Sequence, residues 1–256
     1  MRKILLLVVL IFTFCRCSSD DSSDSSSTTK AFNSSWTPQY TSIVGYWTMT
    51  SSFFSDGSIL LADIGDNGTI RNPNNLGMSS ISGPVSFALH FDGVDDRVQV
   101  PYNNNNNLNL FSVSLWLFVP SFGVNRSPIS SRDAPVAKGY AFYVNSSGQP
   151  EIRIGKGNFD DWGVAIGVTL LQSTWTHIVF TYDGTYVRLY QNGALQASLL
   201  TAYMANTTQP LYLGAGGTEN APNAVDFFLG NIDEVAIWSS VLSDSDVQTI
   251  YQRQKL

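Results

Sequence analysis

The acidic residues of the chain, 20 in all, are first weighed for hydrolytic chemistry by paired carboxylates. Cleavage of a glycosidic bond with retention needs two carboxyl groups about 5 Å apart. On a strand, side chains on one face are two residues apart, so the adjacent Asp233 and Glu234 are expected on opposite faces. The pair Asp160-Asp161 falls in a glycine-rich loop. A glycoside hydrolase or lyase is therefore the third-ranked hypothesis, and it requires the fold to join distant carboxylates such as Asp160 and Glu151.

Nucleophilic catalysis and zinc binding find little support in the chain. The only cysteines are Cys15 and Cys17, near the N-terminus, and no G-x-S-x-G nucleophile elbow is present. The two histidines, His90 and His177, fall within expected strands, where a histidine is more often packed or hydrogen-bonded than a base or a ligand. Zinc sites are built mainly from Cys and His, so zinc is not expected.

Calcium is the more serious candidate, since it takes six to eight oxygen ligands from carboxylates and carbonyls in loops. Three acidic loops qualify: 63–68, 92–96 and 231–233. The alternative is that their Asp and Asn side chains make turns and cap backbone N–H groups, as such residues commonly do.

One tryptophan stands apart from the others. Trp162 follows Phe159, Asp160 and Asp161 in a polar loop flanked by glycines. A sugar ring stacks its apolar face on an exposed aromatic ring, and neighbouring Asp and Asn side chains hydrogen-bond its hydroxyls. These four residues form the candidate ligand platform. The alternative is that Trp162 packs against a sheet edge. The loop Thr218 to Asn223 is a weaker second candidate because it has no aromatic residue.

The elements that must position these residues are predominantly strands. The segment Trp175 to Ala194 alternates apolar residues in two runs, and Asp183-Gly184 and Asn192-Gly193 supply turns with positive φ, which predicts a β-meander. Helical spacing occurs in Ser243 to Tyr251, with Ser243 as N-cap and Asp246 three residues later, and this helix is expected to close one end of the fold. The expected strands are Ile43–Met49, Val85–Phe91, Asp96–Val100, Ser112–Phe118, Val136–Val144, Glu151–Ile154, Gly163–Val168, Thr176–Tyr182, Tyr186–Gln191, Leu211–Leu213 and Glu234–Trp238.

Several of these stretches together resemble one family, the laminin-G-like domain of the concanavalin A-like lectin/glucanase superfamily. The resemblance covers about Ile43 to Tyr251. It rests on WTHIVFTYDG at 175–184, LHFDGVDDRV at 89–98, FSVSLWLFVP at 111–120 and GNIDEVAIW at 230–238, with shorter likenesses at 44–47 and 61–69. It implies an all-β fold, a two-sheet antiparallel β-sandwich or jelly roll with one short C-terminal helix. It also implies that Trp47, Trp116, Trp175 and Trp238 belong to the core.

The same resemblance implies a role and a metal site. Members are binding and adhesion modules in many unrelated proteins, so the family indicates fold better than ligand. Related domains often hold a structural calcium ion. Carried onto this sequence, its ligands would be Asp63, the carbonyls of Asn67 and Gly68, and Asp233.

The N-terminal region has the features of a secreted protein. Residues 1–17 read as a signal peptide, because a basic start precedes the apolar run Ile4 to Phe14, which is too short for a membrane span. Cys17, followed by Ser and Asp residues, resembles the acylated cysteine of a bacterial lipoprotein, although Arg16 departs from the usual small residue. Ordinary cleavage is the alternative. Residues 18–42 form the expected Ser/Asp/Thr-rich tether, of which Ala31 to Ser42 is either packed or mobile, and the domain occupies residues 43–256.

The amino-acid composition limits which classes of ligand are expected. The net charge is −6 and no basic cluster is present, so nucleic acid is not expected as a ligand. The leading hypothesis is a non-catalytic, extracytoplasmic binding module that recognises carbohydrate or a glycosylated partner, with protein–protein adhesion as the alternative. We expect an outer-membrane or cell-surface lipoprotein held by its lipid anchor, or otherwise a secreted or periplasmic protein.

Overall fold

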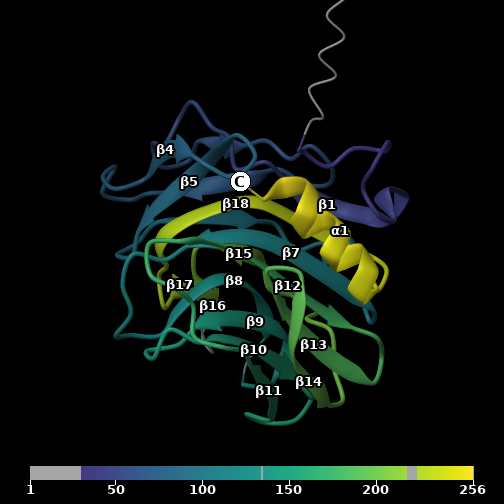
Figure 1. Cartoon of the computed structure of the whole chain (residues 1–256). Helices are drawn as coiled ribbons and strands as arrows, with labels where there is room; N and C mark the ends of the chain where they lie inside the picture. The colour runs from purple at the N-terminus through teal and green to yellow at the C-terminus, as the bar shows by residue number, and fades with distance from the viewer. Residues whose placement is uncertain (1–29, 134, 218–223, 256) are drawn as a thin grey trace, which may run out of the picture.

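Two antiparallel sheets of eight strands each face one another in the computed structural model, which describes residues 30–133, 135–217 and 224–255 (Figure 1). The predicted signal peptide, Cys17 and the predicted tether as far as residue 29 lie outside the described residues, as does the loop Thr218 to Asn223. The expected all-β sandwich with a C-terminal helix is confirmed. None of the helices in the described residues is long and apolar enough to cross a membrane.

The first sheet has the order β14-β13-β12-β7-β18-β5-β4, and β1 pairs with the same edge of β18 as β5 does. It contains the expected meander. Its strands are β1 (Ile43–Trp47), β4 (Ser79–Ser82), β5 (Phe87–Asp92), β7 (Phe111–Phe118), β12 (Trp175–Tyr182), β13 (Tyr186–Gln191), β14 (Ala194–Leu200) and β18 (Leu229–Trp238).

The second sheet has the order β11-β10-β9-β8-β15-β6-β3-β2. Its strands are β2 (Ile59–Leu60), β3 (Gly68–Arg71), β6 (Arg97–Val100), β8 (Arg126–Asp133), β9 (Lys138–Val144), β10 (Pro150–Gly155), β11 (Trp162–Ile166) and β15 (Leu211–Leu213). A two-stranded ribbon adds β16 (Gly216–Gly217) and β17 (Ala224–Val225), and two 3-10 turns are η1 (Tyr40–Ser42) and η2 (Asn104–Asn106).

The two hairpin turns of the meander differ in their chemistry. Asn192 and Gly193 both have positive φ, as a type I′ turn requires. At the other turn only Gly184 has positive φ, and the Asp183 carboxylate accepts hydrogen bonds from the N–H groups of Thr185 and Tyr186 at 2.9 and 2.7 Å. The Asp-Gly turn is therefore held by a side chain rather than by the type I′ geometry that the sequence predicts.

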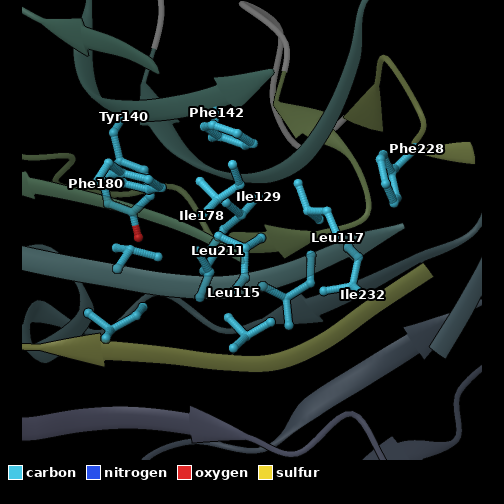
Figure 2. Close-up of a cluster of buried hydrophobic side chains, with 14 of the residues drawn as sticks. Leu115, Leu117, Ile129, Tyr140, Phe142, Ile178, Phe180, Leu211, Phe228 and Ile232 are labelled. Atoms are coloured by element: carbon cyan, nitrogen blue, oxygen red, sulfur yellow. The ribbon is translucent and has the colours of Figure 1, made fainter. Parts of the chain in front are cut away.

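A continuous apolar core fills the space between the sheets (Figure 2). Phe180 of β12 and Phe142 of β9 stack across it, with ring centroids 5.8 Å apart and an interplanar angle of 7°. Offset stacking of this kind adds to the burial of two large apolar side chains. The alternation of inward-facing residues along β7, β9 and β12 therefore fixes how the two sheets are aligned.

A second apolar cluster lies on the outer face of the first sheet, beneath α1 (Asp244–Gln254). Val247 and Ile250 of α1 pack there with Trp238, and the N-cap Ser243 forms the expected capping box with Asp246. Figure 1 shows the helix lying along β18 and β7. The helix therefore covers a sheet face, and the expectation that it closes an end of the sandwich is wrong.

The N-terminal segment belongs to this second cluster. Phe32 is 5% exposed and its ring lies 5.2 Å from that of Tyr46 and 5.3 Å from that of Trp238, both edge to face. Its backbone N–H donates to the Tyr46 hydroxyl at 3.3 Å. Of the two readings of Ala31 to Ser42, the packed one holds, and the folded body begins before Ile43.

Removing this contact tests whether the segment is part of the fold. We expect Phe32→Ala to lower the free energy of unfolding by about 3 kcal/mol, because it empties a buried aromatic site. Urea titration of the full chain measures this. Phe53→Ala is the matched control, since Phe53 is 74% exposed, and its effect should stay within about 0.5 kcal/mol. Equal effects of the two substitutions would show that the segment is not part of the cooperative unit.

Candidate functional site

Trp162 lies at the start of the edge strand β11, half-buried rather than free in a loop. It pairs with Gly155 of β10, and its ring is covered by the guanidinium of Arg132 from β8, with Cζ 5.3 Å from the ring centroid. An arginine over a tryptophan face is a cation–π contact that holds the ring in one orientation. The indole is thus a fixed surface at the sheet edge. It is packed there, as the alternative interpretation expects, and it is also partly exposed, as a ligand platform requires.

The loop before Trp162 is organised by an ion pair. Lys156 Nζ lies 2.5 Å from Asp161 Oδ1, and Asn158 Nδ2 donates to Asp161 Oδ2 at 3.1 Å. The hydrogen bond from Lys156, followed by that from Asn158, lowers the pKa of the Asp161 carboxyl. Asp161 is therefore a charged acceptor held beside the tryptophan.

A groove of about 680 Å³ opens between β11 and β14, where the edge strands of the two sheets approach each other. Trp162 and Lys156 line one side, and Thr185, Leu200 and Thr201 line the other. The volume falls within the range typical of sites for small ligands. An aromatic face, an ammonium group and two hydroxyls in one groove suit a ligand that is partly apolar and rich in hydroxyl groups.

The four predicted platform residues are only partly brought together. Trp162 lines the groove and Asp161 contacts it through Lys156. Phe159 is 77% exposed and Asp160, with φ of 46°, is also exposed, and neither lines the groove. The opposite wall is formed by Thr185, in the turn before β13, and by Leu200 and Thr201 at the end of β14, where the sequence predicted no strand. Its Thr185 and Thr201 carry no local pattern that would single them out.

Apolar side chains also flank the groove on the solvent side. Val164 and Ile166 of β11 are 40% and 45% exposed, because Ala165 between them faces the core. Leu195 and Leu200 of β14 are 46% and 66% exposed. This edge of the molecule is therefore less polar than an ordinary exposed sheet edge, which charged residues usually protect.

Other residues that the sequence placed in strands behave as packed or hydrogen-bonded groups. Trp47 and Trp238 are fully buried and Trp116 is 2% exposed, as expected, while Trp175 is partly exposed at the end of β12. His90 Nδ1 is 2.7 Å from Asn231 Oδ1. The core positions implied for three of the four tryptophans are confirmed.

Ser114 and His177 form a hydrogen-bonded pair that has no catalytic geometry. The hydroxyl lies 2.8 Å from Nε2, both residues are fully buried, and His177 Nδ1 has no hydrogen-bond partner. A catalytic triad needs an orienting carboxylate at that nitrogen and an exposed nucleophile. Burial lowers the pKa of His177 to about 3, so this imidazole is a neutral packed group.

Asp233 and Glu234 occupy a bulge in β18, where the register to β7 shifts and Glu234 has φ of 52°. Ile232 and Val235, on either side of them, both contribute to the core between the sheets. The extra residue therefore keeps both acidic residues out of that core. The expectation that adjacent residues point to opposite faces is wrong here, because it assumes an unbroken strand.

Both carboxylates are fully buried and each has one oxygen without a hydrogen-bond partner. Asp233 Oδ2 accepts from the Val85 N–H at 3.3 Å, and Glu234 Oε2 accepts from the Tyr46 hydroxyl at 2.8 Å and Gln254 Nε2 at 3.1 Å. Burial raises the pKa of Asp233 to about 7, and burial followed by the charge of Asp233 raises the pKa of Glu234 well above its ordinary range. No substrate reaches them in this arrangement.

The calcium ligand set implied by resemblance is spread over this region. Asp63 is exposed, but its charge contributes to the raised pKa of Glu234, so it lies near the bulge. Asn67 Oδ1 accepts from the Ala62 N–H at 2.9 Å, and Gly68 pairs with Leu60 in the ladder between β2 and β3. The unpartnered oxygen of Asp233 fits a cation ligand, and calcium at this set stays a prediction.

The carboxylates proposed for hydrolysis lie in different settings. Glu151 is 6% exposed on β10 and is bound to Arg153, with Nε 2.5 Å from Oε1, whereas Asp160 is exposed in the loop before β11. The groove is lined by neither of them. The arrangement required by the hydrolase hypothesis is thus not formed by these two residues.

The architecture and the edge groove define a jelly-roll β-sandwich of the kind found in binding domains. The chain belongs to the concanavalin A-like lectin/glucanase superfamily, whose laminin G model matches residues 92–248. The match covers more than half of the chain and includes the meander, the bulged strand and the start of α1. No curated protein matches the sequence.

Solved structures with this fold include binding domains of bacterial toxins. The binding domain of paraclostridial mosquitocidal protein 1 is 17% identical, with a TM-score of 0.65, covering 82% of this chain and 52% of that one. The binding domain of botulinum neurotoxin serotype D is 18% identical, with a TM-score of 0.60, covering 83% and 52%. The chain therefore spans about half the length of these toxin domains.

A third similar structure matches over nearly its whole length. It is domain 4 of AbnA, an extracellular arabinanase from Geobacillus stearothermophilus, in complex with arabinotriose. It is 19% identical, with a TM-score of 0.61, covering 82% of this chain and 98% of that one. At these identities the likenesses establish the fold alone.

The raised pKa of Asp233 should make the stability of the protein depend on pH. In the folded state the carboxyl keeps its proton up to about pH 7, whereas the ordinary value is 3.8. The stability contributed by the protonated form is therefore fully present below 3.8 and is lost as the pH rises through 7. The Asn side chain has no such proton to lose. In EDTA, the unfolding free energy of Asp233→Asn minus that of wild type should therefore increase by about 2 kcal/mol between acidic and mildly alkaline pH.

Urea titrations of both proteins across that pH range measure the difference. Asp160→Asn is the control, because Asp160 is exposed, and its curve should run parallel to that of wild type. A wild-type-minus-variant difference for Asp233→Asn that does not change with pH would contradict the assignment of a protonated, buried carboxyl.

Proposed function

We propose that this protein is a non-catalytic binding module that recognises carbohydrate, or a glycosylated partner, through the groove beside Trp162. The observation that carries the proposal is a half-buried tryptophan, held by Arg132, that lines a groove between the edges of the two sheets. Stacking of a sugar needs a fixed aromatic ring, and because the Arg132 guanidinium lies over one face of this indole, the sugar would stack on the other face.

The polar groups of the groove suit the rest of a sugar. Lys156 donates hydrogen bonds, and Thr185 and Thr201 both donate and accept. Thr201 is already a donor to the Ala202 carbonyl at 3.0 Å, which leaves its oxygen as an acceptor. Asp161, ionised and fixed by Lys156, adds an acceptor next to the ring. Sugars present alternating C–H faces and hydroxyl edges, which matches a groove with one aromatic wall and several hydrogen-bonding groups.

The comparisons support this class of ligand without assigning one. The similar domain of the arabinanase was solved with arabinotriose. Another similar structure is that of botulinum neurotoxin type C, whose cell entry is described as dependent on interaction with two ganglioside molecules. Both ligands contain sugars. The fold thus has members that bind glycans, and the groove beside Trp162 is the place in this chain where the chemistry is suitable.

The position of the groove fits a tethered module. Lys30 Nζ donates to the carbonyl of Lys255 at 3.0 Å, and Figure 1 shows the C-terminus toward one end of the molecule and β11 and β14 at the opposite end. A flexible tether running from an acylated Cys17 would hold the domain at a membrane with the groove facing away from it. We propose a cell-surface or outer-membrane lipoprotein on this basis, with a secreted or periplasmic protein as the alternative.

A protein ligand is the second candidate, and the exposed apolar residues of β11 and β14 favour it. Val164, Ile166 and Leu200 form part of an apolar rim that a sugar does not need. Apolar patches rimmed by polar residues often mark protein interaction sites. The glycan experiment below separates the two candidates.

A glycan array of the full chain tests the carbohydrate proposal. We expect wild type to bind a defined set of glycans and Trp162→Ala to weaken that binding at least about tenfold, since it removes the stacking surface. Trp175→Ala is the matched control, because Trp175 is also a partly exposed tryptophan but lies at the end of β12 against Phe118. Its binding should equal that of wild type.

Absence of glycan binding by wild type would overturn the carbohydrate proposal and leave the protein ligand. Equal loss in both tryptophan variants, with unchanged thermal unfolding, would move the site away from the groove. Release of reducing sugars from a polysaccharide panel by wild type would instead establish the hydrolase that the sequence ranked third.

A further inference from the structure

The loop from Asp92 to Asp96 crosses from one sheet to the other. Asp92 is the last residue of β5 in the first sheet, and Arg97 is the first residue of β6 in the second. Asp92 also pairs with Leu229 of β18. Whatever fixes this loop therefore fixes the relative position of the two sheets at this end of the sandwich.

Three carboxylates of the loop converge. Asp92, Asp95 and Asp96 each offer an oxygen, and these oxygens all lie within 4.8 Å of one another. In the part of the chain that the structure describes, no other set of three or more His, Cys, Asp or Glu side chains is this close. Oxygens bound to one calcium ion at 2.3–2.6 Å lie at most about 5 Å apart, so the spacing suits that ion.

The most buried member of the cluster lacks a partner. The Asp96 side chain is 0% exposed, its Oδ2 accepts from the Asp92 N–H at 3.0 Å, and its Oδ1 has no hydrogen-bond partner. Asp95 Oδ1 is likewise buried and unpartnered. Leaving buried carboxylate oxygens without a donor or cation carries a large desolvation cost.

The neighbouring arginines do not supply the missing partner. Arg97 Nη1 donates to the backbone carbonyl of Asp95 at 3.2 Å, and Arg126 Nη1 donates to the carbonyl of Gly93 at 3.3 Å. Both guanidinium groups thus brace the loop backbone. Among the described residues, no ion pair within 4.0 Å involves Asp92, Asp95 or Asp96.

We propose that Asp92, Asp95 and Asp96 bind a calcium ion that ties the two sheets together at the β5–β6 crossover. The ion would neutralise the converging carboxylates and engage the unpartnered oxygens, with water filling its remaining positions. The site is separate from the set implied by family resemblance, which uses Asp63 and Asp233, and from the groove beside Trp162.

A proton is the rival occupant of this cluster. Burial raises the pKa of Asp96 to about 7, so a protonated Asp96 would also reduce the repulsion among the three carboxyl groups. The two occupants predict different behaviour: a calcium site responds to chelator and added calcium at mildly alkaline pH, whereas a protonated cluster responds only to pH.

Thermal unfolding and isothermal titration calorimetry of the full chain with calcium chloride test the proposal. After removal of metal with EDTA, millimolar calcium should raise the Tm of wild type by at least about 3 °C, because the ion binds the folded state. Asp95→Asn, which keeps the size of the side chain at a partly exposed position, should lose the Tm shift and weaken calcium binding at least about tenfold. Magnesium should have a smaller effect.

Asp63→Asn is the matched control, because it alters the other candidate set and leaves the β5–β6 loop intact. It should keep the calcium-dependent rise in Tm. Three results would overturn the proposal: no heat and no Tm shift with wild type, an unchanged response in Asp95→Asn, or loss of the response in Asp63→Asn alone. The last result would place calcium at the set implied by resemblance.

Discussion

Strand β18 pairs with three other strands of the first sheet, and a bulge within it determines where their side chains meet. Its one edge pairs with β7, while its other edge serves β5 over its first half and β1 over its second. The bulge at Asp233-Glu234 lies where one neighbour gives way to the other. Because the bulge keeps two carboxylates out of the core between the sheets, their partners must come from elements outside it.

Those partners come from β1 and α1, which are far apart in the sequence and meet at the bulge. Tyr46 of β1 and Gln254 of α1 both donate to Glu234, and Trp116 of β7 donates to Gln254 at 2.9 Å. Phe32 packs on Tyr46 and Trp238 over the same face. Tyr46 and Gln254 thus satisfy one oxygen of a carboxylate that the strand arrangement buries, and Phe32 packs against that tyrosine. A buried acid that is only partly hydrogen-bonded is tolerated when such a network holds it.

The proposed binding groove depends on the opposite end of the same architecture. A sandwich has edges where the sheets stop, and here β11 and β14 leave a gap lined by residues from both sheets. Core packing aligns the sheets, as the stacking of Phe142 on Phe180 shows, and that alignment brings Thr185 and Thr201 opposite Trp162. The packed core and the edge groove are therefore built from different residues, which allows a common fold to carry different ligand sites.

Elements that rest on local chemistry could be predicted from the sequence. Alternating apolar residues and the Asn-Gly turn predicted β12 and β13 of the meander, whereas β14 was not among the expected strands. Ser243 with Asp246 predicted the start of α1. The Trp, Asp-Gly and Asp-Glu motifs indicated the family and the two-sheet fold. Short or polar strands escaped notice, among them β8, which contains Pro128 and six polar or charged residues, because pairing with adjacent strands rather than propensity decides such segments.

Only the tertiary structure decided which distant residues meet. The bulge reversed the expected separation of Asp233 and Glu234, since a strand period of two holds only while the register is continuous. Trp162 was identifiable from its loop, but the wall opposite it comes from the turn before β13 and from the end of β14, which was not among the expected strands. Phe159 and Asp160, neighbours of Trp162 in sequence, fall outside the groove because the chain turns at Asp160. Proximity along the chain thus identified candidates, and the packing of the two sheets selected among them.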